Sequence, residues 1–255
     1  MFQEPIPEKV LSGKYIKLII KSINDSRGQY EQAAKERNFP TRNGRFHDRW
    51  NFIFNNIQNS FLDEPFKCHV ISRGALWEFV VIYNTDTKIL YVLLKEDRFF
   101  DIKKDSNSKY HYVRVLNSSN YCFQKEEKSE QMSLFPDLKS EPDEYVYEDF
   151  QRMINSIKEE VKGCVNILFK EDKNAVTTIS GNIATYDLDI IKAYNWNEYI
   201  SANIEEISDT NGNDSDVKPQ IQLKIRKNKR KDDNKQKIVD EKKKENMDKN
   251  IGKKN

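Results

Sequence analysis

Six large apolar residues that recur at steps of three and four constrain this chain most. They begin at Phe46 and end at Phe61, and Asp63-Glu64-Pro65 follows soon after. Side chains at this spacing lie on one face of an α-helix, and proline after two acidic residues ends the pattern. The sequence therefore predicts an amphipathic helix with Trp50 at the centre of its stripe, buried against a sheet. The stripe consists of Phe46, Trp50, Ile53, Phe54, Ile57 and Phe61.

The period of the apolar residues changes after this helix. Three segments rich in Val, Ile, Tyr and Phe follow, at Phe66–Arg73, Leu76–Tyr83 and Ile89–Lys95. This composition predicts β-strands. Gly74 separates the first two strands and the polar residues 84–88 separate the second and third. Connections this short favour an antiparallel meander.

Helical spacing also occurs before and after this meander. Val10–Ile23 predicts an N-terminal helix, with Asn24-Asp25-Ser26 as a possible end and Arg27–Arg37 as a continuation. Tyr145–Val161 repeats the pattern. The other predicted elements are strands at Tyr110–Leu116, Cys164–Phe169 and Val176–Ile179, and a short helix through Leu188, Ile191 and Tyr194.

Composition divides the chain into four parts. Residues 1–123 hold the N-terminal helices and the central antiparallel sheet, and residues 124–142 have the polar, proline-containing composition of a linker. Residues 143–204 form a second helix-plus-strands segment that completes the body. Residues 205–255 have almost no apolar side chains towards their end, which predicts a disordered, Lys-rich tail. The expected fold class is α+β.

The tail is strongly basic. Residues 221–255 carry a net charge of +8 in a chain whose total is +2, so the preceding residues are acidic. Such a tail favours weak contact with nucleic acid, and arginines near the start of the aromatic helix are further candidates for phosphate contacts. The predicted nucleic-acid contacts are Arg42, Arg45, Arg49, Lys227, Arg230 and Lys231.

The predicted linker contains one short motif that indicates a molecular function. Its residues 131–135 resemble the peptides that dock onto the bacterial DNA polymerase sliding clamp, whose consensus is Gln, an apolar residue, Ser or Asp, then Leu-Phe. The resemblance implies that Gln131 makes orienting hydrogen bonds and that Leu134 and Phe135 fill a hydrophobic cleft on the clamp. Large apolar side chains in a hydrophilic segment suit such an anchor. The motif reads Gln131, Met132, Ser133, Leu134 and Phe135.

This motif makes a clamp-associated accessory or modulator of bacterial or phage DNA replication or repair the leading hypothesis. The alternative is an enzyme delivered to DNA by the clamp, either a divergent metal-dependent nuclease or a toxin or defence effector. A nuclease needs acidic residues around a divalent cation. Asp86 and Lys88 have acid-x-Lys spacing but fall in a predicted turn, and Glu78 and Glu96 are the other nearby acids.

Cysteine and histidine give little support to a metal or cofactor. The three cysteines form no C-x-x-C pair, and Cys68 and His69, as neighbours in a predicted strand, face opposite sides. We therefore expect no metal site and no cofactor. The N-terminal residues lack the pattern of a signal peptide, and no apolar run has the length of a membrane span. These features predict a cytoplasmic protein without membrane contact.

The chain also resembles an uncharacterised protein family of Gram-positive bacteria and their phages. The residues that carry this resemblance are the run Arg45–Asn51, the later run Asp187–Ile190 and the segment Tyr194–Trp196. The resemblance implies no catalytic residues.

Overall fold

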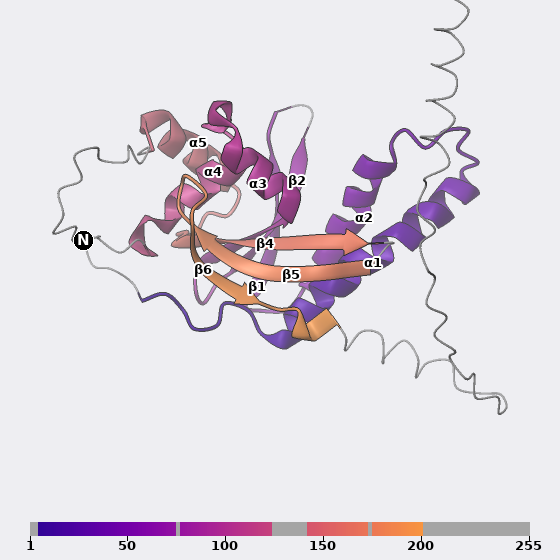
Figure 1. The fold of residues 1–255 in the computed structure, drawn as a ribbon, viewed down its shortest axis with the longest axis horizontal. Helices are drawn as coiled ribbons and strands as arrows, with labels where there is room; N and C mark the ends of the chain where they lie inside the picture. Colours follow the sequence, from indigo (N-terminus) through magenta and orange to yellow (C-terminus); the bar gives the residue numbers. More distant parts are fainter. Residues whose placement is uncertain (1–4, 75–76, 124–141, 173–174, 201–255) are drawn as a thin grey trace, which may run out of the picture. The chain divides into compact units, whose positions relative to one another are not determined.

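A computed structural model describes residues 5–74, 77–123, 142–172 and 175–200. These residues form an α+β body around a six-stranded mixed sheet, so the predicted fold class is confirmed (Figure 1). The strands lie in the sheet in the order of the sequence. They are β1 (Phe66–Ser72), β2 (Glu78–Asn84), β3 (Ile89–Lys95), β4 (Gly163–Asp172), β5 (Ala175–Ala184) and β6 (Ile190–Asn195).

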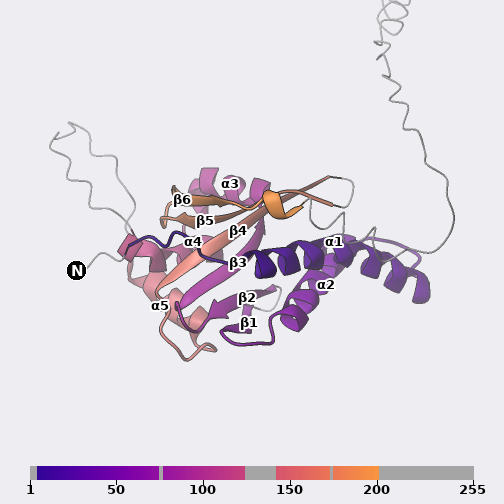
Figure 2. The same ribbon diagram turned by 90° about the horizontal axis from the view of Figure 1, so that it is seen from below.

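Helices cover both faces of this sheet (Figures 1 and 2). The two long N-terminal helices pack together on one face, and the helices between β3 and β4 cover the other. Each face therefore has its own hydrophobic core. The helices are α1 (Gly13–Glu36), α2 (Arg45–Ser60), α3 (Glu96–Lys104), α4 (Tyr112–Asn117) and α5 (Glu144–Ile154), with short 3-10 helices η1 (Ser106–Ser108) and η2 (Ser118–Phe123).

Helix α1 continues through the polar residues at which the sequence suggested a break. The Ser26 hydroxyl donates to the Ile23 carbonyl at 2.6 Å, a bond that leaves the helix intact. Asn24 Oδ1 accepts a hydrogen bond from the Val176 backbone N–H of β5 at 2.9 Å. Asn24 therefore makes a tertiary contact, Ser26 bonds within the helix, and neither side chain caps a helix end.

The predicted meander is confirmed, and the second part of the body joins the same sheet. Strands β1, β2 and β3 pair antiparallel, and the turn between β2 and β3 is fixed by Asn84 Oδ1, which accepts from the Asp86 and Thr87 N–H groups. Strand β4 then pairs parallel with β3, from Ile89 opposite Gly163 onward. A parallel pair requires a long crossover, which α3, α4 and α5 provide.

Two predicted elements have the wrong type. Tyr110–Leu116 was predicted as a strand, but residues 112–117 form helix α4, in which the His111 side chain caps the Val113 N–H. Leu188, Ile191 and Tyr194 were predicted to form a helix, but residues 190–195 form strand β6. Both segments are short, and for short segments helical and strand periodicity are difficult to distinguish.

A buried asparagine joins η2 to the sheet at the end of the β4–β5 ladder. That ladder ends at Val165 opposite Ile183. One residue further, the Asn120 side chain accepts from the Cys164 N–H at 2.7 Å and donates to the Cys164 and Ala184 carbonyls at 2.9 and 2.8 Å. The amide thus replaces a strand–strand hydrogen bond. Asn120 is fully buried, so each of its polar atoms needs a partner inside the protein.

A glycine in β5 allows the Trp196 ring to lie directly on the sheet. A Cβ atom at Gly181 would be 2.4 Å from Trp196 Cζ2, closer than atoms can approach. Trp196 is buried. We expect Gly181→Ala to lower the free energy of unfolding by about 1–3 kcal/mol, the usual cost of overpacking. Urea unfolding monitored by circular dichroism measures this loss.

Gly28 in helix α1 provides the matched control. A Cβ at this position would have no atom within 4 Å. Gly28→Ala should therefore raise the free energy of unfolding by about 0.5–1 kcal/mol, because alanine favours the helix. Equal effects of the two substitutions would contradict the close approach of Trp196.

Candidate functional site

A cavity lies where strands β2 and β3 separate. Their ladder covers only Val81–Asn84 and Ile89–Val92, although the same register would place Phe79 opposite Leu94. A cavity of about 560 Å³ occupies this end of the sheet and is lined by Phe79, Leu93, Leu94 and Lys95, among others. Its size is within the range of small-molecule sites, roughly 300–1,000 Å³. The cavity is the leading candidate site among the described residues.

Helix α2 supplies aromatic rings to one side of this cavity. His47, Trp50 and Phe54 line it from successive turns of the helix. The Trp50 ring centroid is 5.2 Å from that of Phe54 and 6.0 Å from that of Phe169 in β4. The predicted packing of Trp50 against the sheet is thus confirmed, but the ring is only half-buried and part of it faces the cavity. Phe46, predicted in the same stripe, is 66% exposed.

Side chains from the opposite layer complete the lining. Trp77 precedes β2, and its ring centroid is 6.2 Å from that of His47. Tyr112 of α4 lies with its ring centroid 4.4 Å from Phe79 and 4.7 Å from His111. The cavity therefore has rings from both faces of the sheet around it.

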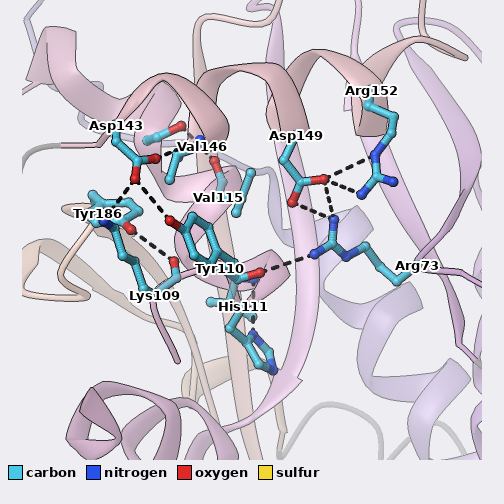
Figure 3. A network of polar contacts seen from close by, with 12 residues as sticks. Arg73, Lys109, Tyr110, His111, Val115, Asp143, Val146, Asp149, Arg152 and Tyr186 are labelled. Carbon is cyan, nitrogen blue, oxygen red and sulfur yellow. Dashed lines mark hydrogen bonds and ion pairs between the residues drawn. The ribbon is translucent and has the colours of Figure 1, made fainter. Parts of the chain in front are cut away.

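A polar network holds the segment that carries His111 (Figure 3). Arg73 donates to both carboxylate oxygens of Asp149, at 2.7 and 2.6 Å, and to the Tyr110 carbonyl at 3.1 Å. Asp143, the cap of α5, forms an ion pair with Lys109 at 2.9 Å and accepts from the Tyr110 hydroxyl at 3.0 Å. Residues 109–111 are thereby fixed to β1 and α5.

Burial keeps His111 uncharged. Burial, together with the nearby guanidinium groups of Arg98, Arg73 and Arg114, lowers the pKa of the imidazole to about 4. His111 Nδ1 accepts the Val113 backbone N–H at 3.3 Å, so the neutral ring carries its proton on Nε2. The cavity is thus lined by a neutral imidazole in a positively charged environment.

This low pKa makes stability depend on pH. Between pH 6.5 and pH 4 the unfolded imidazole takes up a proton that folded His111 does not, so stability falls as the pH falls. Between pH 7 and pH 5, the protonation of this group should lower the free energy of unfolding by about 1–2 kcal/mol, allowing for its partial exposure. In His111→Asn, which retains a helix cap, the loss measured by urea unfolding should be smaller by that amount. Identical pH slopes for the two proteins would contradict the assignment.

Arg49, predicted to contact nucleic acid, instead joins three elements of the body. Its guanidinium forms two hydrogen bonds with the Glu171 carboxylate at the end of β4, one of them at 3.0 Å. It also donates to Ser26 Oγ at 2.9 Å and to the Ile23 carbonyl at 3.3 Å. Only 16% of the Arg49 side chain is exposed. These internal partners give Arg49 a structural role.

The same three residues, Lys-Glu-Asp, occur where β3 passes into α3 (residues 95–97) and at the end of β4 (residues 170–172), and ion pairs cross-link the two segments. Lys95 Nζ lies 3.5 Å from the Glu171 carboxylate, and Lys170 Nζ lies 2.9 Å from that of Glu96. Glu171 is shared with Arg49, so the charge of Lys95 is only partly compensated. Lys95 also lines the cavity, where its positive charge is available to a ligand.

The structure describes two of the other five residues that were predicted to contact nucleic acid. Arg42 forms an ion pair with Glu31, and Arg45 lies over the ring of Phe46, with its guanidinium carbon 4.9 Å from the ring centroid. Their contact with nucleic acid stays a prediction. The residues predicted to bind the clamp, Gln131–Phe135, and the tail residues Lys227, Arg230 and Lys231 lie outside the described residues.

Cys68 and His69 face opposite sides of the sheet, as predicted. Cys68 packs in the core under α1 and α2, whereas the His69 ring centroid is 6.3 Å from that of Tyr83 in the other core. Burial raises the pKa of the Cys68 thiol to about 11, which disfavours a nucleophilic thiolate. Within residues 5–74, 77–123, 142–172 and 175–200, no three metal-ligating side chains form a cluster.

Comparisons with known proteins provide a family but no named relative. No curated protein and no solved structure shows significant similarity to the chain. In the part of the chain that the structure describes, no helix combines the length and the apolar character needed to span a membrane. A family match covers residues 3–241, which is most of the sequence. The chain therefore belongs to the family of unknown function DUF5986.

Proposed function

We propose that this protein docks onto the bacterial DNA polymerase sliding clamp and acts there as an accessory or modulator of replication or repair. The observation that carries the proposal is the match of residues 131–135 to the clamp-binding consensus. Leu134 and Phe135 would provide the apolar anchors, and Gln131 would orient the peptide. Met132 departs from the usual leucine but offers an adaptable apolar contact.

The elements on either side of the motif suit the presentation of a peptide. Helix η2 ends at Phe123, which is buried in the core, and α5 begins after Asp143, which accepts the Val146 N–H at 3.1 Å. The two helices contact each other, with Phe123 in the core under α1 and α2 and the apolar side of α5 in the core on the other face. The last described residues before the motif and the first described residues after it therefore belong to elements that contact each other and are anchored in the body.

Calorimetric titration of the full-length protein with a purified bacterial sliding clamp tests the proposal. A short peptide that becomes ordered on binding should give a free energy of roughly −7 to −9 kcal/mol, which corresponds to a micromolar dissociation constant. A synthetic peptide of residues 128–138 should compete with the protein for the clamp. The absence of binding at clamp concentrations of about 100 μM would exclude this function.

The nuclease alternative has less support. Glu78 is the first residue of β2, and Asp86 lies in the turn after its last residue, Asn84. The length of the strand separates the two acids by roughly 20 Å, too far for one divalent cation or a two-metal site. Asp86 belongs to a turn fixed by Asn84, which matches the structural interpretation of its acid-x-Lys spacing.

A further inference from the structure

We propose that the cavity between β2 and β3 binds a nucleotide, with the base among the aromatic rings and the phosphate at Arg98 and Lys95. This site is independent of the clamp-binding peptide. Three features of the described residues support it: the gradient of polarity in the lining, the rings on both sides and the incompletely compensated positive charge at the rim.

Polarity increases from the floor of the cavity to its rim. Phe79, Leu93 and Leu94 are buried and form an apolar floor. Lys95 and Arg98 are exposed and form a cationic rim. A ligand that fits this lining has a flat apolar part and an anionic end. A nucleotide has both, and a volume of about 560 Å³ can hold a base together with its sugar phosphate.

The rings are arranged so that a planar group can stack. Seven of the eleven lining residues carry a ring, and two of the three tryptophans and two of the three histidines in the chain are among them. Trp50 and Trp77 come from different layers, and both are only half-buried. Aromatic rings bind any nucleobase through its faces, so stacking gives affinity with little base preference.

Arg98 is the cation best placed for the phosphate. Arg73 is paired with Asp149, and Arg114 is held by carbonyl groups and Asp187. Among the described residues, no hydrogen bond or ion pair joins Arg98 to another side chain, yet its charge acts on His111. An arginine without a carboxylate partner can bind two phosphate oxygens at once. The neutral His111 adds an Nε2–H donor in the same cavity.

Calorimetry of the full-length protein with AMP, GMP, CMP and UMP tests this site. At least one of them should bind at least tenfold more tightly than its nucleoside, because only the nucleotide reaches the cationic rim. Inorganic phosphate should not compete at equal concentration. A 5′-phosphorylated hexanucleotide shows whether the natural ligand of this cavity is the end of a nucleic-acid strand or a free nucleotide. Tighter binding than that of the mononucleotide indicates a strand end, and weaker binding indicates a free nucleotide.

Variants test the named contacts. Arg98→Gln and Trp77→Leu should each weaken binding about tenfold or more, whereas Arg152→Gln, a change of an exposed arginine on α5, should leave it unchanged. If Trp77→Leu does not fold, Arg98→Gln decides alone. No binding by any nucleotide at millimolar concentration, equal binding of nucleoside and nucleotide, or unchanged affinity in Arg98→Gln would overturn the proposal. The double substitution of Leu134 and Phe135 should leave nucleotide binding intact, which separates this test from that of clamp docking.

Discussion

Replacing Leu134 and Phe135 together by alanine is expected to abolish binding to the sliding clamp. A short docking peptide owes most of its affinity to one or two buried apolar anchors. Removal of both should raise the dissociation constant at least 100-fold, beyond the range of calorimetry for a micromolar interaction. The midpoint of thermal unfolding should not change, because the proposed role of these side chains is to contact the clamp.

Leu138→Ala is the matched control for this experiment. Leu138 lies in the same hydrophilic segment but three residues beyond the motif. Its replacement should leave the affinity for the clamp within about twofold of the wild-type value. A destabilised double variant, together with a wild-type protein that does not bind the clamp, would mean that Leu134 and Phe135 pack on the body. In that case the leading function is wrong.

Asn120→Ala is expected to have the largest effect on stability. The substitution leaves the Cys164 N–H and the Ala184 carbonyl without their partner in the core, and it removes a hydrogen bond to Asn117 Oδ1. Each buried polar group left without a partner costs about 1–3 kcal/mol. The free energy of unfolding should therefore fall by about 4 kcal/mol, a large fraction of the roughly 5–15 kcal/mol typical of a domain.

Urea unfolding of two further variants tests this explanation. Asn120→Asp retains an acceptor for the Cys164 N–H but loses the donors to the Cys164 and Ala184 carbonyls, so it should also be strongly destabilised. Asn55→Ala, an exposed substitution on α2, should change stability by less than about 0.5 kcal/mol. A loss below about 1.5 kcal/mol for Asn120→Ala would show that water or neighbouring groups replace the amide.

The elements with a long, regular apolar pattern could be predicted from the sequence. The helical stripe through Ile53 and Ile57 and the strand composition of Ile89–Lys95 both correspond to observed elements. Periodicity reports which side of an element faces a core, so it is most informative where one side is clearly buried. Trp50 shows the limit of this signal, because a stripe does not distinguish a ring in a core from a ring that borders a cavity.

The errors occur where burial does not follow one face. All residues of α4 from Val113 to Asn117 are buried, so an apolar stripe is absent and its valines favoured a strand assignment. Strand β6 lies at the sheet edge with mostly exposed or half-buried residues, so the spacing of Ile191 and Tyr194 fits a helix as well. The parallel pairing of β3 with β4 depends on contacts across the whole crossover, which local patterns do not contain.

The cavity could not be predicted because its residues come from separate parts of the chain. His47, Trp77 and His111 meet only when α2, the start of β2 and the start of α4 come together. His47 and Trp50 belong to the run Arg45–Asn51 that carries the family resemblance, whereas Arg98 lies in α3, a helix with many charged residues and no such motif. The early end of the β2–β3 ladder, which creates the space, has no sequence signal that we recognise.

The parallel pairing of β3 and β4 also affects the folding of this protein during translation. Six of the seven residues of β3 are buried in the complete sheet, and β4 begins about 70 residues later in the chain. At a translation rate of roughly 5–20 residues per second, β3 is an uncovered apolar edge for several seconds on the ribosome. Such an edge is a binding site for chaperones and a starting point for aggregation. A chain that is truncated before Gly163 keeps this edge permanently, so nonsense fragments of this gene should accumulate as insoluble or chaperone-bound protein.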